Sequence, residues 1–92
     1  MLTKNIGLRL GRTGLRCNGI CSGATNTYPV EAWDNCELPG GNVMIDVSKK
    51  HVNWDLPTVK PEQQANVALF LDSDMSSAMQ GQLLTVDNGA FA

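Results

Sequence analysis

The 92-residue sequence predicts a small α/β unit of a larger parallel sheet, in the order helix, strand, long loop, helix, strand. Two segments carry apolar residues at helical spacing, and two short segments have the alternating or β-branched character of strands. The second helix lies between the strands, which is the order of a right-handed parallel crossover. Because two strands alone are marginal in water, we expect further strands beside them.

The first helix is expected over residues 1–10, because Leu2, Ile6 and Leu10 lie four residues apart and share one face. Gly11 ends this helix and begins a tight turn. No capping residue precedes the helix, which begins at the first methionine. We therefore expect the chain to begin inside a longer helix, as a truncated gene, a misassigned start or an engineered piece would.

The first strand is expected over residues 15–21 and ends at the turn Ser22–Gly23. Cys17 and Cys21 share one face of this strand, about 13 Å apart. Bridged cysteines need Cα atoms within roughly 7 Å, so the two form neither a disulfide nor one metal site, and we expect small buried side chains. Three cysteines give no disulfide framework, and a reducing cytoplasm is the expected location.

The connection that follows is long, and residues 28–60 are interpreted as a lid or substrate loop with a short helix over residues 42–50. Trp33 and Trp54 are its large aromatic residues, and they either close over a substrate or cover core surface. His51 is the only histidine, and without cysteine or carboxylate ligands at metal spacing it is expected to be a solvated loop residue. No metal site is predicted.

The second helix is expected over residues 61–71, because Pro61 suits the first helical position and Glu62 suits the positive end of the helix dipole. Its apolar stripe is wide enough to contact neighbours on two sides. The stripe consists of Gln64, Val67, Ala68 and Leu71. The last strand is expected over residues 82–86, where two leucines precede two β-branched residues.

The composition narrows the class of function. Apolar residues make up 42% of the chain, as in globular proteins, and a net charge of −2 with scattered basic residues argues against nucleic-acid binding. No apolar run approaches the roughly 18 residues that span a bilayer, and the N-terminus lacks the features of a signal peptide. We expect neither nucleic acid nor a membrane as a partner.

A set of short segments forms a pattern along the chain. The segments are Leu2–Leu8, Gly14–Gly23, Thr25–Thr27, Pro61–Leu71, Ser73–Asp74, Ser77, Gly81–Gln82 and Val86–Gly89. In this order they resemble the C-terminal part of the short-chain dehydrogenase/reductase family, from the end of its catalytic helix to its last strand. The resemblance implies an NAD(P)-dependent oxidoreductase of small carbonyl or alcohol substrates. It also implies a doubly wound Rossmann-like parallel sheet, of which residues 1–92 form a partial domain.

The resemblance further implies a cofactor site. The family holds the nicotinamide carboxamide at the loop after its sixth strand, and the matching positions are Ser22, Gly23, Thr25 and Thr27. A carboxamide presents one acceptor and two donors, which backbone groups and one hydroxyl suit. Ser22 stands where the family commonly has proline. The choice between NAD and NADP depends on a ribose-binding residue outside these segments.

The family's catalytic elements have no counterpart in these 92 residues. Its catalytic tyrosine is followed four residues later by lysine, whereas the only tyrosine here, Tyr28, is followed by Ala32. Lys4 lies beyond the catalytic position, and no glycine-rich phosphate loop precedes a helix. We therefore assign no catalytic residue and expect the chain alone to show neither turnover nor dinucleotide binding.

Two interpretations remain open. The chain is either the C-terminal part of a short-chain oxidoreductase, or a non-catalytic interaction module of that fold that assembles with itself or with a full-length relative. A homo-oligomer is expected, since the family's last helix and strand commonly pair between subunits, where Phe91 could pack. The unpaired edge of the first strand also favours self-association.

Overall fold

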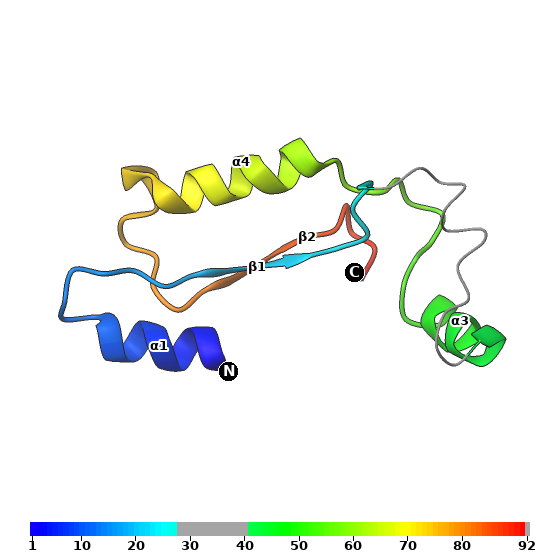
Figure 1. The fold of residues 1–92 in the computed structure, drawn as a ribbon, viewed down its shortest axis with the longest axis horizontal. Helices are drawn as coiled ribbons and strands as arrows, with labels where there is room; N and C mark the ends of the chain where they lie inside the picture. Colours follow the sequence, from blue (N-terminus) through cyan, green and yellow to red (C-terminus); the bar gives the residue numbers. More distant parts are fainter. Residues whose placement is uncertain (28–40, 92) are drawn as a thin grey trace.

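The computed structural model describes residues 1–27 and 41–91 (Figure 1). Its elements are helix α1 (Leu2–Leu10), strand β1 (Gly19–Ser22), helix α3 (Gly41–Lys49), helix α4 (Pro61–Asp72), the 3-10 helix η1 (Asp74–Ser76) and strand β2 (Leu83–Val86). The predicted order of elements is confirmed, and the bounds of the three α-helices and of β2 differ from the expected ones by at most one residue. Among the described residues, no helix combines the length and the apolar character needed to cross a membrane.

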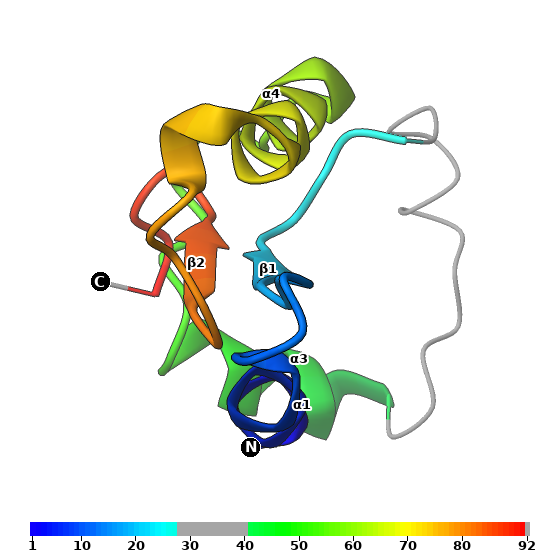
Figure 2. The same cartoon turned by 90° about the vertical axis from the view of Figure 1, so that its left-hand side faces the viewer.

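The two strands form the centre of three layers. They pair in parallel, from Gly19 opposite Leu83 to Ser22 opposite Val86. Figure 1 and Figure 2 show α4 on one face of the pair and α1 on the other. Parallel strands with helices on both faces are the layer arrangement of a doubly wound α/β fold, as the sequence predicts.

Helix α1 contacts the turn before β2 through a glycine. A Cβ atom added at Gly7 would lie 2.8 Å from the Cα atom of Gly81, so the two backbones are in direct contact. Gly7 is buried and Thr3, one turn earlier, is half-buried. Leu2 is 73% exposed and Ile6 36% exposed, so the apolar face that these residues share is not covered by the described residues. A glycine pair lets the helix come closer than leucines would allow.

Strand β1 is shorter than the predicted strand over residues 15–21. Residues 15–18 bond instead to the turn before β2, where the Cys17 amide donates to Gln80 Oε1 at 2.8 Å and the Gly81 amide donates to the Cys17 carbonyl at 2.8 Å. Because a side chain takes the place of a ladder partner, the strand begins only at Gly19. Cys17 is half-buried, but Cys21 is exposed, and for Cys21 the predicted burial is wrong.

Arg16 fastens this segment to the end of α4. Its guanidinium donates to the Ser76 carbonyl at 2.8 Å, to Ser76 Oγ at 2.6 Å and to the Ser73 carbonyl at 3.1 Å. Ser76 is 1% exposed. A planar, always charged donor suits such a convergent set of acceptors.

Helix α4 begins and ends as the sequence predicts. Pro61 occupies the first turn, and the Lys60 amide donates to Gln63 Oε1 at 2.9 Å, which caps the start. The end is closed by the Ser73 amide, which donates to the carbonyls of Leu69 and Phe70. Of the predicted stripe, Ala68 is exposed and the other three residues are half-buried, so α4 contacts the sheet on one side only within the described residues.

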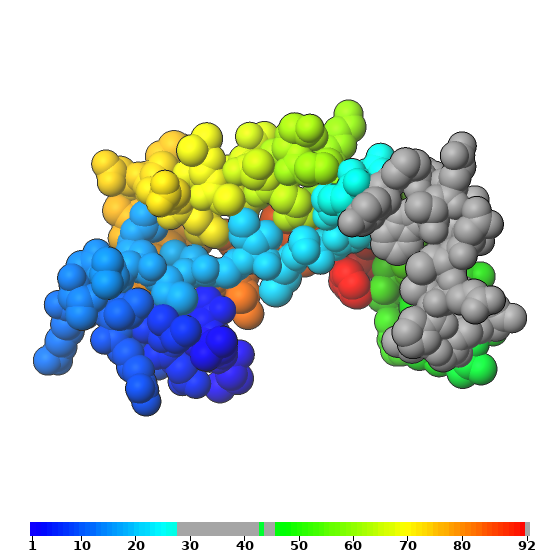
Figure 3. All heavy atoms as spheres, viewed as in Figure 1, coloured from blue at the N-terminus to red at the C-terminus, as the bar shows by residue number. Residues whose placement is uncertain are grey.

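Little apolar surface is buried. Among the described hydrophobic side chains, only that of Val59 is buried, at 1% exposure. Leu8 on α1 is 81% exposed and Leu69 on α4 is 68% exposed. The Cα radius of gyration is 16.5 Å and the longest extent 48 Å (Figure 3), whereas a compact domain of this length has a radius of about 12 Å. Most of the apolar surface is therefore free to contact further structure.

Candidate functional site

The carboxyl ends of β1 and β2 lie at the same end of the sheet (Figure 1). Residues 22–27 follow β1 and are here called the cofactor loop, after the site that the family resemblance leads us to expect there. The turn of residues 87–91 follows β2. In open parallel sheets, ligands bind beyond the carboxyl ends of the strands. All four predicted site residues lie in the cofactor loop at this edge.

Gly23 brings the loop into backbone contact with the end of β2. Its amide donates to the Val86 carbonyl at 2.9 Å. A Cβ atom at position 23 would lie 2.6 Å from the Cα atom of Asp87 and 2.6 Å from its Cβ atom. Any side chain here would push the two strand ends apart, so the close approach requires glycine.

Thr25 lies at the centre of the cofactor loop and is half-buried. It pairs with Val59 in an isolated parallel bridge, in which the Asn26 amide donates to the Val59 carbonyl at 2.9 Å and the Val59 amide donates to the Ala24 carbonyl at 2.8 Å. The Thr25 hydroxyl donates to the Gly23 carbonyl at 3.0 Å. The segment just before α4 thus holds the loop against the sheet.

Ser22 and Thr27 are exposed at the two ends of the loop. The Thr27 amide donates to the Thr25 carbonyl at 2.9 Å, which turns the backbone sharply. In the part of the chain that the structure describes, the Thr25 amide donates to no group, and the Thr27 hydroxyl makes no hydrogen bond. One free amide donor and one free hydroxyl in neighbouring residues fit the polar groups of a carboxamide.

Asp87 organises the turn on the other side of Gly23. Asp87 is 9% exposed, and its carboxylate accepts hydrogen bonds from the Gly89 amide at 2.9 Å and the Phe91 amide at 3.0 Å. Asn88 and Gly89 have φ angles of 55° and 83°, in the left-handed region that asparagine and glycine tolerate. With this turn, β2 ends at Val86.

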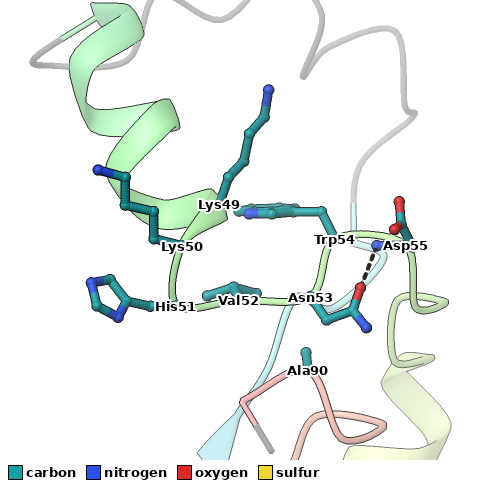
Figure 4. A pocket seen from close by; sticks show the side chains of 8 residues that line it. All are labelled: Lys49, Lys50, His51, Val52, Asn53, Trp54, Asp55 and Ala90. Atoms are coloured by element: carbon teal, nitrogen blue, oxygen red, sulfur yellow. Dashed lines mark hydrogen bonds between the residues drawn. The ribbon is translucent and has the colours of Figure 1, made fainter.

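Residues 53–57, near the C-terminal end of the predicted lid, hydrogen-bond to the turn of residues 87–91. The Asn53 amide donates to the Ala90 carbonyl at 2.8 Å, and Asn88 Nδ2 donates to the Pro57 carbonyl at 2.9 Å. An open cavity of about 510 Å³ lies beside it, and Figure 4 shows the residues that line it, which are Lys49, Lys50, His51, Val52, Asn53, Trp54, Asp55 and Ala90. Trp54 is 55% exposed at this cavity, so it does not cover the core.

The remaining predicted residues divide between the surface and the undescribed segment. His51 is exposed, as expected of a solvated loop residue. Tyr28, Trp33 and Cys36 lie outside the described residues. Among the described residues, no three histidine, cysteine or acidic side chains gather as metal ligands would.

Two residues of the site were not singled out as such from the sequence. Gln64 is a polar residue within an apolar helical stripe, and a buried polar group usually has a partner to satisfy. Asp87 precedes asparagine and glycine, which is the pattern of a turn in which an aspartate accepts nearby backbone amides. The sequence thus indicates that both side chains have polar partners. Only the folded structure shows that Gln64 pairs with Thr25 and that Asp87 accepts from the Phe91 amide.

Parallel strands with helices on both faces, and a glycine-bearing loop at their carboxyl edge, define part of a Rossmann-like α/β domain. The family model described as enoyl-(acyl carrier protein) reductase matches residues 1–90. The chain belongs to the short-chain dehydrogenase/reductase family.

Individual relatives agree with this assignment. The chain is 33% identical over 93 residues to short chain dehydrogenase adrF of Penicillium rubens, covering 94% of this chain and 35% of the relative. Hydroxysteroid dehydrogenase from Escherichia coli superposes with a TM-score of 0.70 at 31% identity, covering 99% of this chain and 35% of that one. A 3-oxoacyl-[acyl-carrier protein] reductase from Brucella melitensis, solved with bound NAD, gives 0.69 at 26% identity and covers 99% and 29%. The chain spans about a third of the length of these proteins.

Proposed function

We propose that the chain supplies the nicotinamide side of an NAD(P)-dependent oxidoreductase that transfers hydride between the cofactor and a small carbonyl or alcohol compound. The observation that carries the proposal is the cofactor loop at the carboxyl edge of two parallel strands, closed against Asp87 by Gly23. The homologous reductase with bound NAD supports a nicotinamide cofactor. The bound cofactor would supply the hydride, and residues 22–27 would bind and orient its carboxamide.

Within this proposal, each site residue has a distinct task. The exposed Thr27 hydroxyl and the free Thr25 amide would hydrogen-bond the carboxamide, while Gly23 keeps the loop close to the sheet. Ser22, exposed at the end of β1, would shape the turn into the loop. Residues 28–60 would form the lid over the substrate, with Trp54 on its cavity.

The chain would not perform the reaction by itself. No tyrosine in the 92 residues has a lysine four residues later, so the acid–base pair must come from other polypeptide. We expect no binding of NADH or NADPH by the isolated chain in isothermal titration calorimetry. Micromolar affinity would contradict this expectation.

A chimera tests the cofactor assignment. The matching third of Escherichia coli hydroxysteroid dehydrogenase would be replaced by residues 1–92, and NADH affinity measured by calorimetry. We expect the chimera to bind NADH, Gly23→Val to abolish binding, and Thr27→Val to weaken it roughly tenfold, the value of one lost hydrogen bond. Thr13→Val, in the turn after α1, is the matched control and should bind like the parent chimera. Equal affinities of the Thr27 and Thr13 variants would refute the assignment.

A second function, as a non-catalytic interaction module, is favoured by the exposed apolar side chains. Met1, Leu8 and Met75 are each more than 80% exposed, and only Val59 is a buried hydrophobic side chain among the described residues. Apolar side chains left exposed in this way are available to an association surface. We expect the isolated chain to form homo-oligomers in multi-angle light scattering, and a monodisperse monomer at tens of micromolar would count against it.

The free thiols of Cys17 and Cys21 are consistent with a reducing cytoplasm.

A further inference from the structure

Gln64 carries an amide in the face of α4 that lies over the sheet. Its Nε2 atom donates to the Val86 carbonyl at 2.9 Å and to Thr25 Oγ1 at 3.4 Å. The first hydrogen bond reaches the end of β2, and the second reaches the cofactor loop after β1. One side chain therefore joins α4 to both strand ends at the candidate site.

The contact with Thr25 continues into the loop backbone. The Thr25 hydroxyl accepts from Gln64 and donates its own proton to the Gly23 carbonyl at 3.0 Å. This series of hydrogen bonds runs from the helix to the glycine that touches Asp87. Hydrogen bonds in series polarise one another, so losing the first weakens the second.

The orientation of Gln64 leaves one of its atoms without a partner. Gln64 Oε1 is buried and accepts no hydrogen bond from the described residues. A buried carbonyl oxygen without a donor lowers stability, and an apolar side chain of similar size would avoid that cost. Packing alone therefore does not explain a glutamine at this position, whereas its two hydrogen bonds do.

We propose that Gln64 is a positioning residue for the cofactor loop, acting through the Thr25 hydroxyl on the Gly23 carbonyl. The consequence for a nicotinamide rests on the proposed function of residues 22–27. The ordering of the loop by Gln64 does not, since it is measurable with no cofactor present.

Amide hydrogen exchange of the full 92-residue chain, followed by NMR, tests the proposal. The reporters are the amides of Asn26 and Val59, which hold the loop, and those of Gly19 and Gly81, which hydrogen-bond at the other end of the sheet. In Gln64→Leu, we expect Asn26 and Val59 to exchange about tenfold faster and the two distant amides to change by less than about twofold. Gln64→Glu keeps the shape of the side chain but loses the N–H donor, and at neutral pH it should accelerate the same amides as Gln64→Leu.

A double-mutant cycle separates action through Thr25 from packing. If Gln64 acts through the Thr25 hydroxyl, Thr25→Val and Gln64→Leu break the same series of hydrogen bonds, and we expect exchange at Asn26 in the double variant to stay within about twofold of that in Gln64→Leu alone. Gln80→Leu is the matched control, since Gln80 also bridges segments, donating to the Gly7 and Leu15 carbonyls at 2.8 and 3.0 Å. It should accelerate Gly81 and spare Asn26.

Two results would overturn the proposal. One is equal acceleration of all four reporter amides in Gln64→Leu, or additive acceleration at Asn26 in the double variant, either of which would assign Gln64 a role in stability that does not pass through Thr25. The other is unchanged exchange at Asn26 in both single variants.

Discussion

The contact between α1 and the turn before β2 can be tested with Gly7, inside the helix, and Gly11, at its C-terminal cap. In Gly7→Ala, the new Cβ would lie 2.8 Å from both the Cα and N atoms of Gly81, whereas carbon atoms in contact prefer about 3.5–4.0 Å. Both neighbours are backbone atoms, so no rotamer change relieves the clash. Overpacking of this kind costs up to about 3 kcal/mol, and the gain in helix propensity offsets about 1 kcal/mol. We expect a net destabilisation of about 2 kcal/mol.

Gly11→Ala is the matched control. Its Cβ would lie 3.6 Å from the carbonyl oxygens of Gly7 and Leu8, an ordinary contact, and its φ angle is −56°. The substitution should therefore stabilise by about 0.4–1 kcal/mol. Urea denaturation followed by circular dichroism measures both variants, and the reasoning fails if Gly7→Ala is as stable as Gly11→Ala. If Gly7→Ala only detaches α1 and leaves the strands paired, the helical circular dichroism signal should fall while hydrogen exchange of the Gly19 amide stays unchanged.

Three further substitutions test two turns and the hydrogen bonds by which Arg16, before β1, holds the segment that follows α4; these hydrogen bonds are here called the clasp. Gly14→Ala meets no atom within 4 Å, but its φ angle of 79° is left-handed, so urea denaturation should show a loss of about 1–2 kcal/mol from backbone strain alone. Arg16→Lys cannot reproduce three directed hydrogen bonds and should lower the melting temperature, whereas exposed Arg12→Lys should not; equal melting would contradict the clasp. Asp87→Asn replaces one accepting oxygen by a donor facing a backbone amide and should cost about 1–3 kcal/mol in the same denaturation experiment. Asp46→Asn, on the exposed side of α3, serves as its control, and a similar midpoint for both would refute the role of the carboxylate.

Local chemistry made most of the fold predictable. Pro61 and Glu62 mark the start of α4, Gly11 marks the end of α1, and the β-branched pair Thr85–Val86 marks β2. These signals act within a few residues and need no knowledge of the rest of the chain. Local chemistry predicts only a turn at Ser22–Gly23, and the site assignment of Ser22, Gly23, Thr25 and Thr27 depends on the resemblance to the short-chain dehydrogenase/reductase family.

Contacts between distant segments were not predictable in this way. The helical spacing of Leu2 and Ile6 identifies an apolar face but not its partner, and the chain itself packs α1 through Gly7 and Gly81. Strand β1 begins late because the Gln80 side chain replaces a ladder partner, a choice that depends on a turn more than 60 residues away. Likewise, the alternation of side chains along a strand places Cys21 on one face of β1 but does not show whether another segment covers that face. In the structure Cys21 is exposed.

The contact of Gly23 with Asp87 has a consequence for how this region moves. Most neighbouring segments in a protein are separated by side chains, whose rotamers absorb small displacements. Here the backbone at Gly23, after β1, lies directly against the backbone at Asp87, after β2, with no side chain between them. We therefore expect a displacement of residues 87–91 to move residues 22–27 as well, because no change of side-chain rotamer can take up the displacement between Gly23 and Asp87.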